Sequence, residues 1–163
     1  MKPVPTTPAM LAFKALNRDI DTRWVKWAGD MLEAGYDSIN LKILAGETEP
    51  FNQFELHTLT EKILSGLNLD WSNTEQAVKN YVSFLIQRTL SGEHETFITL
   101  TELKDLCIEL DYPKYLYDFY LLCYAREDLD YSENQYYWEG ATRENIGSLV
   151  KDCMERWESN YSG

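Results

Sequence analysis

The residues with the clearest potential for chemistry lie in the segment DLDYSENQYYWE, residues 128–139. Asp128, Asp130, Ser132 and Glu139 stand at positions 1, 3, 5 and 12 of this window, where an EF-hand loop places oxygen ligands for Ca²⁺. Asn134 stands at position 7, which contributes only a backbone carbonyl. By side-chain type, Asp128, Asp130, Ser132 and Glu139 are therefore candidate metal ligands.

The backbone requirements of an EF-hand loop are not met by the same window. Position 6 needs glycine for a sharp turn, and here it is Glu133. Gln135 stands at position 8, which is usually aliphatic, and Gly140 interrupts the segment where the exiting helix should continue. We therefore predict no metal site, and keep weak cation binding by these carboxylates as an alternative.

The same segment also has the composition of a protein-binding surface. Aromatic residues and acids alternate here without an intervening base, and Tyr and Trp contribute most of the binding energy at many interfaces. Acidic neighbours would steer a basic partner toward them. The residues that we expect to bind the partner are Asp128, Asp130, Tyr131, Glu133, Tyr136, Tyr137 and Trp138. The alternative is that Trp138 and one or two of the tyrosines close the bottom of the core.

Motifs for catalysis are missing from the chain. His57 precedes Glu61 by four residues, and His94 lies in the polar turn SGEHE. Neither histidine belongs to a Glu-x-x-His or His-Glu-x-x-His motif, and the chain has no glycine-rich nucleotide loop and no G-x-S-x-G. We predict that His57 is an exposed helix residue paired with Glu61, and we predict neither a catalytic residue nor a cofactor.

The three cysteines, Cys107, Cys123 and Cys153, are far apart and form no CxxC pair. Each lies within an apolar helical pattern, which favours buried free thiols in a reducing cytoplasm over metal ligands or a nucleophile.

The charge of the chain is strongly negative and unevenly distributed. The 27 acids and 15 bases give a net charge of −12. Residues 101–163 contain 14 of the acids and 6 of the bases, so eight of the twelve excess negative charges lie there. Such a surface repels nucleic acid and anionic lipid, and attracts a basic protein or a cation.

The length of 163 residues suits one domain that buries a substantial core. We expect a single helical domain over residues 1–163, with a flexible segment at residues 1–8. No apolar stretch approaches the roughly 20 residues that span a bilayer, and the start of the chain does not read as a signal peptide. We therefore expect a cytoplasmic protein without a membrane anchor.

Apolar spacing predicts helices along nearly the whole chain. Trp24, Trp27, Ala28 and Met31 follow the i, i+3, i+4, i+7 pattern, and Gly35 then ends the helix. Comparable stripes and caps predict helices over 22–34, 38–45, 52–66, 72–92, 99–110, 111–127 and 142–157. The segment ETFITL, residues 95–100, could extend briefly. We expect an all-α fold with a single compact array of seven or eight helices.

The helix over 111–127 carries apolar residues on two faces. Leu116, Phe119 and Cys123 make one face, while Tyr117 and Tyr124 belong to the other. A helix apolar on two faces is usually packed between others. We therefore expect most of its aromatic side chains to be core.

Two stretches, WVKWAGDMLEAGYDSINLKILAG (24–46) and LCIELDYPKYLYDFYLLCYAREDLD (106–130), resemble those of small acidic helical bacterial proteins without an assigned activity. Some proteins of this type are similar to immunity proteins, which neutralise a toxin by binding it. The resemblance covers under a third of the chain and implies a bacterial interaction protein, without implying any functional residue.

Together these features favour a non-enzymatic protein that binds a basic partner through an acidic, aromatic surface in its C-terminal third. An immunity-type inhibitor of a basic toxin is the sharpest form of this hypothesis. The alternative is a divalent-cation-binding or carboxylate-dependent enzyme that uses the cluster from Asp128 to Glu139. The sequence does not specify the oligomeric state.

Overall fold

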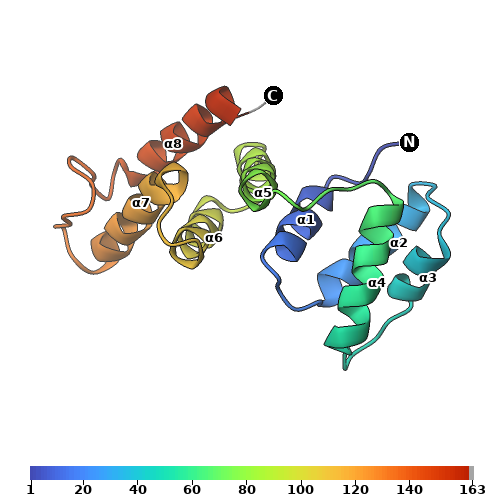
Figure 1. Ribbon diagram of the computed structural model, residues 1–163. Coiled ribbons are helices and arrows are strands. Elements are labelled where there is room, and N and C mark those ends of the chain that lie inside the picture. The colour runs from blue at the N-terminus through green and yellow to red at the C-terminus, as the bar shows by residue number, and fades with distance from the viewer. Residues whose placement is uncertain (162–163) are drawn as a thin grey trace. The chain divides into compact units, whose positions relative to one another are not determined.

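The computed structural model describes residues 1–161, and this part of the chain is helical without a strand (Figure 1). Eight helices follow one another along it, which confirms the predicted all-α class and number of helices. Their bounds are α1 Thr7–Ala15, α2 Thr22–Glu33, α3 Ile39–Ala45, α4 Gln53–Gly66, α5 Thr74–Leu90, α6 Thr96–Glu109, α7 Lys114–Tyr131 and α8 Ile146–Tyr161.

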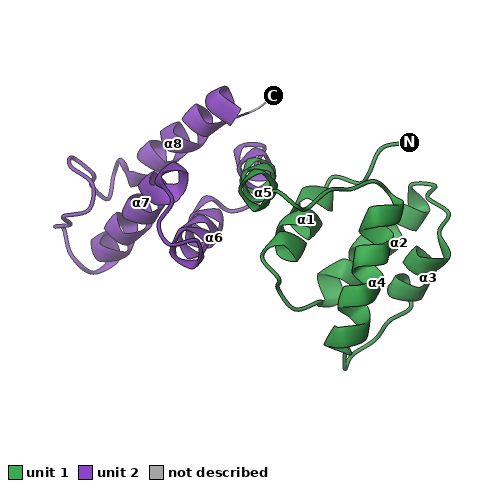
Figure 2. Cartoon of the chain, viewed as in Figure 1, with its two compact units in different colours: residues 1–84 green, residues 85–163 purple. Residues whose placement is uncertain are grey.

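The chain divides into two compact units within α5 (Figure 2). Unit 1 comprises residues 1–84 and unit 2 comprises residues 85–163. Each unit has buried apolar side chains of its own. The expectations of one domain over residues 1–163 and of a flexible segment at residues 1–8 stay predictions.

Unit 1 is built around the predicted stripe on α2. Trp24, Trp27, Ala28 and Met31 are all buried, and α2 packs against α3. The α2 N-cap is Asp21, whose carboxylate accepts a hydrogen bond from the amide of Arg23. The spacing of the apolar residues thus correctly predicted both the helix and its buried face.

Helix α1 is the element that the sequence analysis did not predict. The sequence analysis predicted no helix there, but Pro8 lies in the first turn of α1, where the missing amide hydrogen costs nothing. Ala12 and Phe13 are buried, and Trp27 Nε1 donates a 3.0 Å hydrogen bond to Thr7 Oγ1. Burial of this short apolar run is what stabilises the helix.

In unit 2, α7 packs against both α6 and α8 (Figure 1). One face of α7 is buried, with Leu116, Phe119 and Cys123 among its residues. Helix α8 presents the predicted stripe, in which Val150 and Met154 are fully buried.

The segment ETFITL forms the N-terminus of α6, so the expectation that it extends is wrong. Glu95 caps the helix by accepting a 2.8 Å hydrogen bond from the amide of Ile98. Thr99, the first residue of the helix predicted over 99–110, is buried, with its Oγ1 2.6 Å from Thr89 Oγ1. Tertiary packing of Thr99 and Leu100 outweighs the β propensity of the segment.

Candidate functional site

The acidic aromatic segment begins on a helix rather than in a loop, which corrects the sequence analysis. Helix α7 continues to Tyr131 instead of ending near residue 127, so Asp128, Asp130 and Tyr131 are helical. The helix continues because Ala125 and Leu129, one turn apart, are both buried and extend its apolar face. Ser132 then leaves the helix with extended backbone.

Asp128 and Asp130 thus lie in the last turn of α7, which contains no basic residue. The helix dipole places partial negative charge at this end, so these carboxylates are in an unfavourable position. Two bases outside the last turn partly compensate. Arg126 lies one turn earlier on α7, with its Nη1 3.5 Å from Asp130 Oδ2, and Arg143 Nε donates a 2.6 Å hydrogen bond to the carbonyl of Leu129. The folded surface therefore contains bases that the sequence segment itself lacks.

The segment that follows is held in shape by the side chain of Gln135. Its Oε1 accepts hydrogen bonds from the amides of Tyr137 and Trp138, at 2.9 and 2.8 Å. Its Nε2 donates to the carbonyl oxygens of Trp138 and Ala141. One side chain thus fixes the turn that carries Tyr137 and Trp138.

The aromatic residues predicted to bind a partner differ widely in exposure. Tyr131 and Tyr136 are 91% and 93% exposed, and Tyr137 is 41% exposed. Trp138 is half-buried. Among the acids, Asp130 and Glu133 are exposed, Asp128 is half-buried, and Glu139 is exposed. The structure thus leaves Tyr131, Tyr136, Asp130 and Glu133 accessible to a partner.

Sequence analysis missed a row of five contacting tyrosines on unit 2, which we call the tyrosine ladder. Ring centroids are 5.3 Å apart for Tyr112 and Tyr120, 5.5 Å for Tyr117 and Tyr120, 4.9 Å for Tyr120 and Tyr124, and 5.5 Å for Tyr124 and Tyr137. The expectation that the aromatic residues of this helix are mostly core is therefore wrong, since only Phe119 among them is buried. The i, i+3, i+7 spacing of Tyr117, Tyr120 and Tyr124 could have revealed the shared face.

The first ring of the ladder is held by an uncommon backbone conformation. Asp111 and Tyr112 both have φ of 60°, in the left-handed region that a tyrosine rarely adopts. The amide of Tyr112 donates a 2.8 Å hydrogen bond to the carbonyl of Cys107, which closes the end of α6. The chain therefore places a large ring where glycine or asparagine would be less strained.

Burial raises the pKa of the Tyr120 hydroxyl, and the neighbouring Tyr112, Tyr124, Tyr117 and Tyr137 raise it further. The charged form is unfavourable there because the other hydroxyl groups of the ladder lie close by. Tyr120 contacts three of the other rings and is the central member of the ladder.

The three thiols are buried and free, as the sequence predicted. Burial raises the pKa of Cys107 and Cys123, and raises that of Cys153 to about 11. Because the thiolate is the reactive form, these groups are poor nucleophiles at neutral pH.

The candidate metal ligands do not form a cluster. Among residues 1–161, no group of three or more His, Cys, Asp or Glu side chains is placed to hold a metal ion. Asp128 and Asp130 lie on α7, whereas Ser132 and Glu139 lie beyond its end. Among the described residues, these four side chains thus form no preformed site for a cation.

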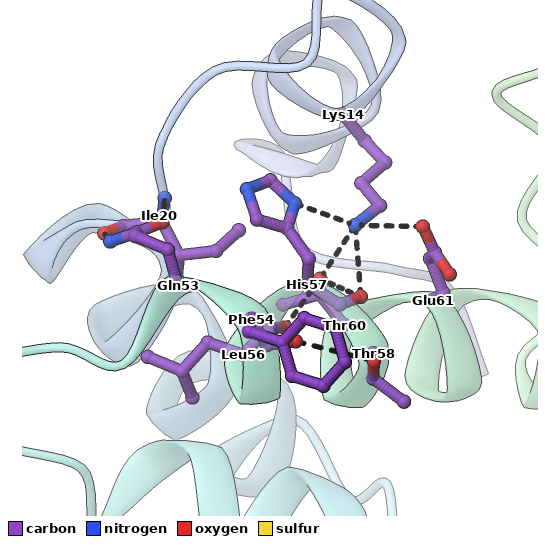
Figure 3. A network of polar contacts seen from close by, with 9 residues as sticks. All are labelled: Lys14, Ile20, Gln53, Phe54, Leu56, His57, Thr58, Thr60 and Glu61. Atoms are coloured by element: carbon purple, nitrogen blue, oxygen red, sulfur yellow. Dashed lines mark hydrogen bonds and ion pairs between the residues drawn. The ribbon is translucent and has the colours of Figure 1, made fainter.

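A separate polar network lies in unit 1, around the buried side chain of Lys14 (Figure 3). Lys14 Nζ lies 3.1 Å from His57 Nδ1, 3.0 Å from the carbonyl oxygen of His57, 3.0 Å from Thr60 Oγ1 and 3.4 Å from Glu61 Oε1. Glu61 thus pairs with Lys14, and His57 is half-buried, so the expectation of an exposed His57–Glu61 pair is wrong.

Burial lowers the pKa of Lys14, although Glu61 opposes this effect. A charged Lys14 can only donate, so His57 Nδ1 accepts the hydrogen bond and the hydrogen of the ring is on Nε2. The network joins α1 to α4, and we interpret it as a structural contact.

A cavity of about 530 Å³ opens in unit 1 between the N-terminal prolines and the start of α5. Its lining includes Pro5, Pro8, Leu11 and the amides of Gln76 and Asn80. Asp70 is the one ionisable residue in the lining, and its carboxylate accepts a hydrogen bond from the amide of Ser72. These groups provide no acid–base pair for catalysis.

Comparisons with family models, with curated proteins and with solved structures find no match to this chain. None of the helices in the described part of the chain is long and apolar enough to cross a membrane. The resemblance to immunity proteins and the absence of nucleic-acid binding stay predictions.

Proposed function

We propose that the protein binds a basic partner protein through the acidic aromatic surface of unit 2. This surface consists of Asp128, Asp130, Tyr131, Glu133, Tyr136, Tyr137 and Trp138. Its role is recognition without catalysis, and its location in the cell is the cytoplasm.

One observation supports this proposal: the carboxylates and the aromatic rings of the surface occupy positions where they do not stabilise the fold. Asp128 and Asp130 lie at the C-terminal end of α7, where the helix dipole disfavours carboxylates. Tyr131 and Tyr136 extend into solvent with little contact to the protein. Natural proteins break local rules of this kind most often at functional sites.

In the mechanism that we propose, the carboxylates pair with Lys and Arg side chains of the partner. The tyrosine rings then become buried and contribute most of the affinity. In its sharpest form the partner is a basic toxin, and the protein inhibits it by covering its functional surface.

In the test, the full chain is immobilised on a resin and incubated with a lysate of the cells that produce it. The variant Asp128→Lys, Asp130→Lys, Glu133→Lys reverses three charges of the surface. We expect the wild type to retain a basic protein at about 0.05 M salt, and to release it at about 0.5 M as the charges become screened. The triple variant should retain none of it.

The matched control reverses three exposed acids of unit 1, in the variant Asp19→Lys, Glu33→Lys, Glu49→Lys. It has the same net charge as the test variant, so it should still retain the partner. Equal retention of every partner by the wild type and the first variant would contradict the proposal.

A further inference from the structure

The tyrosine ladder forms a continuous aromatic surface that remains accessible in unit 2. Tyr112, Tyr117 and Tyr137 are 47%, 42% and 41% exposed. Tyr120 and Tyr124 are half-buried and connect these three rings. An aromatic face with partly exposed rings is suited to stacking with a planar or cationic group.

The unit that carries the ladder is strongly acidic. Residues 85–163 contain 16 acids and 7 bases. Four of these bases are in ion pairs within the unit, namely Lys104 with Asp105, Arg88 with Glu93, Arg126 with Asp130 and Lys151 with Glu155. The unit thus has nine more acids than bases, so a cationic ligand is favoured.

The rings of unit 2 already contact cations from the same chain. Lys104 Nζ lies 5.7 Å from the ring centroid of Tyr124, and the guanidinium carbon of Arg126 lies 4.4 Å from that of Phe97. Both distances are within the range of cation–π attraction. The remaining exposed rings offer the same interaction to a partner.

We propose that the tyrosine ladder binds arginine side chains of an extended basic segment of the partner. This inference rests on the proposed function and adds the class of side chain that is recognised. The guanidinium planes stack on Tyr112, Tyr117 and Tyr137, while carboxylates such as those of Asp111 and Glu127 accept hydrogen bonds from their edges.

Arginine suits this surface better than lysine for two physical reasons. Its guanidinium is planar and stacks on an aromatic face, whereas the ammonium of lysine is a compact and strongly hydrated charge. It also presents a fork of donors that can bond a carboxylate while its plane lies on a ring. A surface with charge alone would not distinguish the two residues.

The test compares three synthetic peptides that share one spacing, with four arginines, four lysines or four citrullines separated by Gly-Ser pairs. Citrulline is planar like arginine but neutral. Titration calorimetry with the full chain should show the arginine peptide binding about five- to tenfold more tightly than the lysine peptide, with the citrulline peptide weakest.

Ring removal is tested with Tyr117→Ser combined with Tyr112→Asn, since asparagine tolerates the left-handed backbone at this position. The preference for arginine over lysine should fall to about twofold or less. Tyr117→Phe keeps the ring and should keep the preference. Phe54→Ser removes an 85% exposed ring from unit 1 and should also leave the preference unchanged. If the double variant fails to fold, Tyr117→Ser alone provides the test.

The outcomes separate this inference from the proposed function. Equal affinity for the arginine and lysine peptides, or no binding of either, would overturn the inference. The proposed function would not be affected by that result, because it is tested separately by partner capture. The variant with Asp128, Asp130 and Glu133 reversed should weaken both peptides and leave the arginine preference in place. An arginine preference that survives removal of both rings would also overturn the inference.

Discussion

At the scale of single residues, the chain places ionisable groups in surroundings that oppose their charge. Lys14 is the clearest example, because its ammonium group is buried beside His57 and Glu61. Asp128 is another, because it lies at the wrong end of a helix dipole. The first group has a structural role in unit 1, and the second belongs to the proposed binding surface.

Lys14 should give the stability of the protein a measurable pH dependence. Its pKa in the folded state is lowered from 10.5, so the unfolded chain binds more protons between the lowered value and 10.5. The contribution of Lys14 to the free energy of unfolding should therefore rise with pH across that window, by at most about 1.4 kcal/mol per pH unit for one proton, whereas the raised pKa values of the buried thiols act in the opposite direction. Lys14→Met should remove this rise, as measured by urea denaturation at several pH values.

The matched control is Lys26→Met, which removes an exposed lysine that pairs with Asp30. It should keep the pH profile of the wild type. At neutral pH the Lys14→Met variant should be within about 1 kcal/mol of the wild type, because the Glu61 side chain that loses its partner is 55% exposed and stays solvated. If the free energy of unfolding of the Lys14→Met variant depended on pH as in the wild type, this account of the network would be contradicted.

At the scale of elements, the C-terminal end of α7 and the turn after it decide how the surface is presented. Asp128→Asn removes a carboxylate from the last turn without changing the size of the side chain. The free energy of unfolding should rise by about 0.3–1 kcal/mol at low salt, because the unfavourable contact with the helix dipole is lost. Thermal or urea denaturation measures this change.

Asp118→Asn is the matched control, since Asp118 lies near the opposite end of the same helix. It should bring no gain in stability. If Asp128→Asn lowered the stability of the protein, the carboxylate would have a structural role, and the argument that it is retained for binding would fail.

Gln135 should act as a positioning residue for the rings of Tyr137 and Trp138. Gln135→Ala removes the acceptor of both amides, so their hydrogen exchange should become about 3- to 10-fold faster. Gln135→Glu keeps an acceptor oxygen and should keep most of this protection. The affinity for the captured partner should follow the same order, with alanine weakest.

Gln87→Ala, at an exposed position on α5, should leave both amides and the affinity unchanged. Exchange rates at Tyr137 and Trp138 that are the same in all variants would show that the turn is held by other contacts.

The stripes of apolar residues allowed most of the helices to be predicted from the sequence. They failed where composition misleads: α1 follows several prolines, and the end of α7 is rich in acids. In both cases burial of a few apolar residues, such as Phe13 in α1 and Leu129 in α7, decides the structure. Such burial depends on neighbours that the local sequence does not reveal.

At the scale of the whole molecule, the distribution of charge along the chain could be predicted from the sequence. The set of residues that form the binding surface could be predicted only in part. Counting residues already placed most of the negative charge in the C-terminal part of the chain. The tyrosine ladder was not predicted as a surface, because Tyr112 and Tyr137 join it from outside α7. Likewise, Arg143 reaches the acidic end of α7 only through the fold, whereas Arg126 lies four residues before Asp130 on the same helix.

The central claim is that unit 2 recognises a basic protein by charge and aromatic contact together. The most direct measurement is the dissociation constant of the captured partner as a function of salt, for the wild type and for the variant Asp128→Lys, Asp130→Lys, Glu133→Lys. We predict that the wild type loses at least about tenfold in affinity between low and high salt, while the variant binds weakly with little salt dependence. An affinity that is the same in both proteins and independent of salt would contradict the claim.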